Sequence, residues 1–175
     1  MNIFLQLVQI LLLRRRPQDL EFDQFAAAFY AVAAAGLTFI TSAQAGVFSQ
    51  PLLISIVQTV SQAGLLFLFL RIANRSQRFV QTCTAMFGIS AILSAFMWLL
   101  TQAPGLSLLV PFLVVWSIVI TILILRDAFD ATTLKAFFIM LAMGMLSVLV
   151  VMLLVPSYVT EAQQIFSTGA GDGSS

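Results

Sequence analysis

The chain has 175 residues, of which 61% are hydrophobic and 9% are charged, with a formal net charge of +1. Soluble domains carry about 25% charged residues, so this composition excludes an ordinary soluble protein and predicts an all-α integral membrane protein. The basic residues are spread over loops, which argues against a nucleic-acid interface. Histidine is absent and Cys83 is the single cysteine. We therefore expect no metal and no other cofactor.

The first element in chain order is a short apolar stretch, residues 1–13, in which Asn2, Gln6 and Gln9 share one narrow helical stripe. As a helix it would reach roughly 20 Å, which is short of the ~30 Å hydrocarbon core. We predict that residues 1–16 form an interfacial amphipathic helix with its arginines among anionic headgroups, a docking face for a partner being the alternative. Because the positive charge follows the apolar stretch, no cleaved signal peptide is expected. The arginines are Arg14, Arg15 and Arg16.

Two long uncharged runs follow. Residues 24–70 and 79–125 contain no Asp, Glu, Lys, Arg or His, and each is long enough for two spans of about 20 residues and a tight turn. A basic hinge at 71–78 separates them, and a fifth apolar stretch ends before Pro156. We predict a membrane domain at 17–156, built as two helical hairpins plus one helix, and a polar disordered tail at 157–175. The predicted spans are about 25–43, 52–70, 79–100, 106–125 and 134–155.

Small and polar side chains within the predicted spans indicate where helices touch. Ala27, Ala31 and Ala35 recur every four residues in the first span, and Gly88 lies on a similar stripe in the third. Small residues at this spacing let another helix approach closely. In the second span, Ser55, Gln58 and Gln62 fall on one helical face. Glutamines in hydrocarbon need hydrogen-bond partners or water, so this face predicts interhelical hydrogen bonding, with a polar solute path as the alternative.

One carboxylate pair lies near a membrane face. Asp127 and Asp130 are three residues apart, and such a pair could hold Mg²⁺ in a lipid-modifying enzyme. Arg126 and Lys135 lie nearby, so local ion pairs in a solvated loop are the favoured interpretation. The span interiors contain no Asp, Glu, Arg or His, and Lys135 lies at the start of the last span, which argues against proton relays and ion-coupled transport. With no histidine to act as a base, we expect no enzyme.

The basic residues also predict an orientation. When five spans are threaded through a membrane, all eight basic residues fall on one side, and the two turns on the other side carry none. The basic side of short loops is cytoplasmic. The N-terminus is therefore predicted to be cytoplasmic and the C-terminus periplasmic, in a bacterial inner membrane. The basic residues of the hinge are Arg71, Arg75 and Arg78.

The order of these features resembles a known family. The chain resembles the Yip-type five-span membrane domain in five features. These are an amphipathic lead, an entry with the sequence Arg16-Pro17-Gln18-Asp19-Leu20, five spans, short outer turns and an outward C-terminus. The resemblance covers nearly the whole chain at the level of topology. It implies a multi-pass helical membrane protein, and its bacterial members are inner-membrane proteins. The eukaryotic Asp-Leu-Tyr-Gly-Pro signature diverges here after Asp19-Leu20, so the resemblance assigns no functional residues.

Two functional hypotheses follow from the sequence. The first is a non-enzymatic scaffold or assembly subunit of a membrane complex, whose arginines dock a protein partner or anionic lipid. The second is a small oligomeric channel or carrier, with the face that carries Ser55, Gln58 and Gln62 as its solute path. The expected partners are membrane lipids and either another protein or further copies of this chain, without nucleic acid.

Overall fold

The protein is described by a computed structural model that covers residues 3–12, 14, 17, 20, 22–46, 48–102 and 105–160. These residues form helices and turns and contain no strand. Five of the helices are long and apolar enough to cross a membrane. The prediction of an all-helical chain with five helices of spanning length and composition is therefore confirmed for these residues. The helices are α1 (Ile3–Leu11), α2 (Gln24–Ala45), α3 (Pro51–Ile72), α4 (Phe79–Gln102), α5 (Val110–Phe129) and α6 (Thr133–Leu154), with 3₁₀ turns η2 (Ser76–Arg78) and η3 (Leu106–Leu109).

Local sequence explains where the spanning helices begin and end. The Asp23 carboxylate accepts hydrogen bonds from the backbone N–H groups of Phe25 (2.9 Å) and Ala26 (3.2 Å), which caps the start of α2. Gly46, with φ at 62°, ends the same helix in the left-handed conformation that glycine adopts without strain. Pro51 opens α3 at a position where its missing N–H costs nothing.

Helix α4 is the centre of the bundle. In its most apolar stretch 44% of the residues are buried, against 11–22% in the other four spans. Helix α2 packs most extensively on α4, and α3 packs most extensively on α6. The sequence neighbours α2 and α3, and α4 and α5, are also in contact. The bundle is therefore held by pairings that cross between the two predicted hairpins as well as by those within them.

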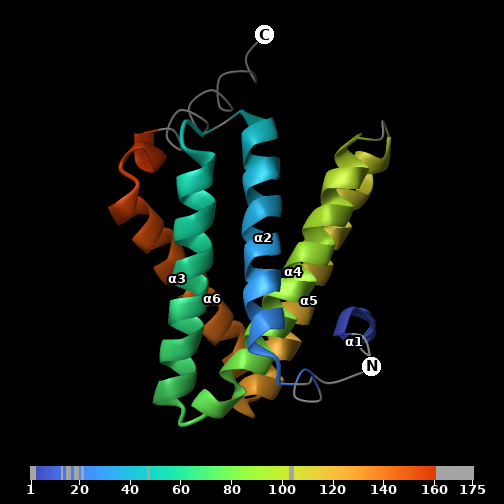
Figure 1. The fold of residues 1–175 in the computed structure, drawn as a ribbon, viewed down its shortest axis with the longest axis vertical. Helices are drawn as coiled ribbons and strands as arrows, with labels where there is room; N and C mark the ends of the chain where they lie inside the picture. The colour runs from blue at the N-terminus through green and yellow to red at the C-terminus, as the bar shows by residue number, and fades with distance from the viewer. Residues whose placement is uncertain are drawn as a thin grey trace.

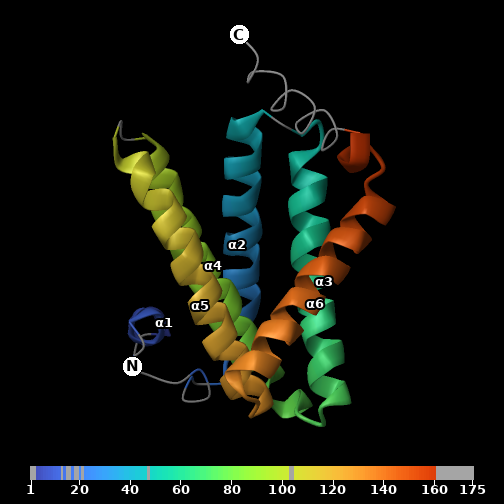
Figure 2. The same ribbon diagram turned by 180° about the vertical axis from the view of Figure 1, so that it is seen from behind.

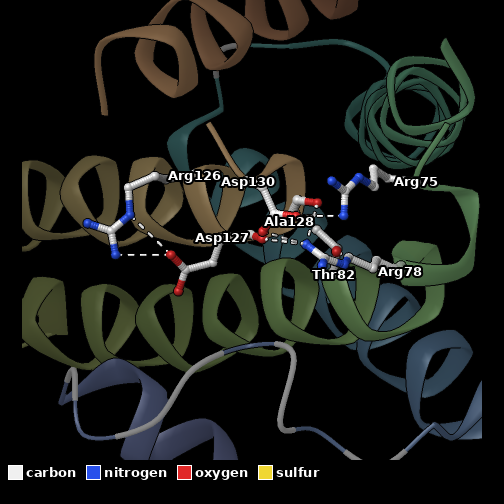
Figure 3. A network of polar contacts seen from close by, with 7 residues as sticks. All are labelled: Arg75, Arg78, Thr82, Arg126, Asp127, Ala128 and Asp130. Atoms are coloured by element: carbon white, nitrogen blue, oxygen red, sulfur yellow. Dashed lines mark hydrogen bonds and ion pairs between the residues drawn. The ribbon is translucent and has the colours of Figure 1, made fainter. Parts of the chain in front are cut away.

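The spans form a wedge that opens toward one end. Helices α5 and α6 meet near the α5–α6 turn and diverge from there, with α4 leaning along α5 (Figures 1 and 2). We call the end at which they meet the charged end, because Arg75, Arg78 and Asp130 lie there (Figure 3). The opposite end, where α2 and α4 finish, is called the open end.

An apolar cluster closes the bundle beside the charged end. Leu66, Leu70 and Leu125 are almost fully buried in it, and they come from α3 and α5. Cys83 and Phe87 of α4 belong to the same cluster. Ala34 of α2 and Ala136 of α6 belong to it too. Side chains from all five spans therefore meet in one packed layer at the narrow part of the wedge.

Helix α1 packs against the spans as well. Figures 1 and 2 show α1 nearly end-on, whereas the spans run along the vertical, so α1 crosses them steeply. Leu7 and Ile10 are buried in a cluster with side chains of α4 and α5. Gln6, from the predicted polar stripe, is buried too. The location of α1 at a lipid interface stays a prediction, and of its three arginines Arg14 is exposed while Arg15 and Arg16 lie outside the described residues.

Candidate functional site

The charged end is organised by Arg78. Its Nη1 group donates to the backbone carbonyls of Asp127 (2.9 Å) and Ala128 (3.3 Å), at the C-terminal end of α5. The same group donates to Oδ1 of Asp130 at 3.0 Å (Figure 3). Carbonyls in the last turn of a helix lack intrahelical partners and carry the negative end of the helix dipole. Arg78 therefore ties the start of α4 to the end of α5.

Two further ion pairs complete this network. Arg75 contacts Oδ2 of Asp130 at 2.6 Å, and Arg126 pairs with Asp127 at 3.0 Å. Arg126 and Asp127 thus form a local ion pair of the kind that the sequence predicted. Asp130 instead pairs with arginines of the distant hinge. The described residues contain no group of three His, Cys, Asp or Glu side chains arranged to hold a metal.

The hydrogen bond from Arg78, together with the positive charges of Arg78 and Arg75, lowers the pKa of Asp130 below its ordinary value of 3.8, against a smaller opposing effect of desolvation. The unfolded chain therefore takes up a proton at Asp130 before the folded chain does as the pH falls. We expect this contribution to stability to be complete at pH 7 and to be lost as the pH drops through and below the ordinary carboxyl range. The thermal midpoint of unfolding in detergent should be higher for wild type than for Asp130→Asn at pH 7, and the difference should shrink as the pH falls. A constant difference between the two proteins would contradict this expectation.

The hinge arginines predicted to dock lipid or a partner differ in their surroundings. Arg71 is exposed at the end of α3. Arg75 and Arg78 bind Asp130 within the chain. Of the three hinge arginines, Arg71 keeps its charge most available for a headgroup.

The predicted packing residues occupy several environments. Ala31 packs on the apolar cluster beside the charged end. The most buried alanine of α2 is Ala34, three residues further along, at 4% exposure. Ala27 and Ala35 are half-buried. Gly88 faces α1: a Cβ placed on it would lie 2.5 Å from Cδ1 of Leu7. The close approach at Gly88 therefore serves the N-terminal helix rather than another span.

A cavity lies in the middle of the bundle. It measures about 220 Å³ and is lined from all of α3, α4, α5 and α6. Gln62, Ser90 and Thr121 supply its polar lining, and Met86 and Met143 are among its apolar walls. Ser55 is buried and donates to the carbonyl of Leu52, so the predicted polar face splits: Gln62 reaches this central cavity, and Ser55 bonds to its own helix.

Two more cavities follow α4 from the central cavity toward the open end. A connecting cavity of about 150 Å³ shares Ser90 and Thr121 with it, and adds Ser94 and Ser117 between α4 and α5. An end cavity of about 640 Å³ shares Ser94 and lies between α2 and α4. We call these three cavities together the polar cleft. The end cavity is also lined by Thr41, Gln44, Trp98, Thr101 and Gln102.

The lining of the polar cleft offers neutral hydrogen-bonding groups. Thr121 donates to the carbonyl of Ser117, which leaves its oxygen lone pairs free to accept. The side chains of Gln62 and Ser90 make no hydrogen bond to any other described residue. Unpaired amides and hydroxyls in an apolar environment cost free energy unless water or a ligand bonds to them. The cleft is therefore suited to an uncharged molecule that both donates and accepts.

Sequence reasoning missed the hydroxyl side of this cleft. Ser90 and Ser94 are four residues apart on α4, and Ser117 and Thr121 repeat that spacing on α5. That periodicity is visible in the sequence and marks one polar face on each helix. That these two faces lie near Gln62 of α3, however, depends on packing between segments far apart in the sequence, which periodicity does not predict.

Comparison with known proteins adds no relative. No protein-family model matches the chain, and neither the curated proteins nor the solved structures contain a significant match to it. The resemblance to the Yip-type family therefore stays a prediction.

Proposed function

We propose that this protein is a non-enzymatic membrane carrier for a small uncharged solute that forms hydrogen bonds. The observation that carries the proposal is the polar cleft, whose three cavities share lining residues in succession from the open end to Gln62 in the middle of α3. Among the residues that the structure describes, none with an ionisable side chain lines these three cavities. A charged solute would pay a large desolvation cost there, and a neutral one would not.

The opposite side of the cleft is closed. Between Gln62 and the charged end lies the apolar cluster with Leu66, Leu70 and Leu125, and beyond it the network around Arg78. A site that is open on one side and closed on the other is one of the two states that an alternating-access carrier needs. By the distribution of basic residues, the closed side would be cytoplasmic and the cleft would open to the periplasm.

Replacing Gln62 with Leu is expected to lower solute flux at least about tenfold. The central cavity then loses the amide that would form hydrogen bonds with the solute during its passage. The measurement is uptake of glycerol and of urea into proteoliposomes, read by light scattering. Gln58→Leu is the matched control, since Gln58 is one turn away on the same helix and is not part of the central cavity. Equal flux through wild type and Gln62→Leu would rule out the carrier proposal.

A second candidate is the assembly subunit, and one observation favours it. In four spans only 11–22% of the residues of the most apolar stretch are buried within the chain, so many apolar side chains there are left to lipid or to another membrane protein. A partner span could seat on such a surface through close packing. Extraction in mild detergent, followed by mass measurement and identification of bound proteins, would separate the candidates. A stoichiometric partner supports the assembly subunit, and a single species active in flux supports the carrier.

A further inference from the structure

The end cavity has the size and the lining of a ligand site. At about 640 Å³ it is the largest of the three cavities of the polar cleft, and it falls within the range of volumes that bind small molecules. Helices α2 and α4 diverge toward the open end (Figures 1 and 2), and the cavity lies between them. Of the described residues that line it, all but Met97 carry a polar group and none is charged. A pocket suited to a polar, uncharged molecule therefore lies where a solute would first enter the cleft.

Trp98 is the aromatic residue of this lining. Its Nε1 group donates a hydrogen bond to Oε1 of Gln44 at 3.0 Å, which links α4 to α2 across the space between them. An interfacial tryptophan usually points this N–H group at water and headgroups, whereas here a side chain of the neighbouring helix accepts it. The hydrogen bond involves the edge of the indole and takes no part of its face. Trp98 is therefore held in place at the cavity by a contact that does not use the face of the ring.

The other polar groups of the end cavity are left both to accept and to donate. The hydroxyls of Thr41 and Thr101 donate to backbone carbonyls of their own helices, so their lone pairs remain to accept. The oxygen of the Gln44 amide accepts from the indole, so its NH₂ group remains to donate. The side chains of Ser94 and Gln102 make no hydrogen bond with the described residues. A ligand with several hydroxyl groups could bond to all of these side chains.

We propose that the end cavity is the entry site for a short neutral polyol. The carbon chain of the polyol would lie against the indole of Trp98, and its hydroxyls would bond to the surrounding amides and hydroxyls. This inference rests on the proposed carrier function and names its substrate class. The C–H groups of a polyol carry a weak positive charge and suit the negative face of an aromatic ring. The connecting cavity beyond is the smallest of the three at about 150 Å³, which favours a chain of few carbons over an oligosaccharide.

The test uses the two tryptophans of the chain, because of these only Trp98 lines the cleft. Trp116 packs with the cluster beside α1 instead. Trp116→Phe therefore leaves Trp98 as the only tryptophan, and Trp98→Phe leaves Trp116. Erythritol is titrated into each protein in liposomes, and tryptophan emission is recorded. We expect a saturable change from the protein that retains Trp98 and none from the protein that retains Trp116. Urea, which has no C–H groups, should give no saturable change in either protein.

A second substitution tests the polar part of the site. Gln102→Leu, made in the protein that retains Trp98, should raise the half-saturating concentration of erythritol about tenfold, because the site then loses an amide that bonds to the ligand. Gln50→Leu is the matched control, since Gln50 lies at the start of α3 at the same end of the molecule and does not line the cavity. Both glutamines are exposed, so neither change disturbs the packing of the bundle. The control should leave the half-saturating concentration unchanged.

The outcomes separate this inference from the carrier proposal. A linear response to erythritol that is equal in both single-tryptophan proteins is an effect of bulk solvent and would overturn the entry site. If glycerol flux still depended on Gln62 in that case, the carrier would stand without it. Saturable binding of urea at Trp98, as strong as that of erythritol, would overturn the polyol as the ligand. Saturable binding of erythritol that Gln102→Leu weakens and Gln50→Leu does not supports the inference. Wild type, which has both tryptophans, should show the same half-saturating concentration, and this guards against a folding defect in Trp116→Phe.

Discussion

Gly88→Leu is expected to release α1 from the bundle. A Cβ at residue 88 would lie 2.5 Å and 2.9 Å from the two terminal carbons of Leu7, and Leu7 is fully buried. The end of the Leu7 side chain must therefore shift, and a leucine at residue 88 brings three further carbons into the same buried contact. Overpacking of this kind costs about 3 kcal/mol at the upper end of its usual range. Hydrogen–deuterium exchange of the Ile3–Leu11 amides in nanodiscs should increase sharply, and the thermal midpoint should fall.

Two controls make this result specific to the contact. Gly36→Leu places the same side chain on α2 where no atom lies within 4 Å, and it should leave exchange in α1 unchanged. Leu7→Ala combined with Gly88→Leu should cost less than the sum of the single changes, because the new leucine fills the space left by the old one. Unaltered protection of α1 in Gly88→Leu would show that α1 is held by other contacts.

Arg78→Met is expected to open the charged end. The change removes charged hydrogen bonds to two carbonyls of α5 and to Asp130. Losing such bonds costs about 2 kcal/mol, which multiplies an open population by about 30. Cys83 reports on this opening without any further mutation, because it is the single cysteine and only 6% exposed in the cluster above Arg78. Its rate of modification by a maleimide should rise by a comparable factor.

Arg71→Met is the matched control for this experiment. Arg71 lies in the same hinge, is exposed and makes no ion pair with the described residues, so its loss should leave Cys83 protected. Arg75→Met should have an intermediate effect, since its ion pair with Asp130 is close to half exposed and is screened by solvent. If Cys83 reacted equally slowly in all of these variants, the apolar cluster alone would close the bundle.

The spans could be predicted from the sequence because they depend on local composition. Long runs without charge and breakers such as Pro51 fix where helices lie, whatever they pack against. The pairing of α2 with α4 could not be predicted, since small residues recur in several spans and any of them could face another. Gly88 shows the difficulty: its spacing indicated a close contact, but the partner was Leu7, about 80 residues earlier in the chain.

The candidate site was predictable only in part. The sequence singled out Gln58 and Gln62 as a pair, because both lie on the same face of one helix. Nothing in the sequence of that helix indicates which of the two lies at the centre of the bundle. The structure places Gln62 at the meeting point of four helices, which depends on their crossing geometry. Likewise, the sequence grouped the hinge arginines together because all of them are charged. In the structure, Arg78 donates to a carbonyl of α5 and to Asp130, whereas Arg71 is exposed.

The wedge shape has a consequence for the lipid around the protein. Helices that meet at one end and spread at the other (Figures 1 and 2) occupy a larger cross-section in one leaflet than in the other. Inserting many copies from the same direction expands one leaflet relative to its partner, and the bilayer relieves the difference by bending. Such a molecule would gather where the membrane is already convex on the side of its open end.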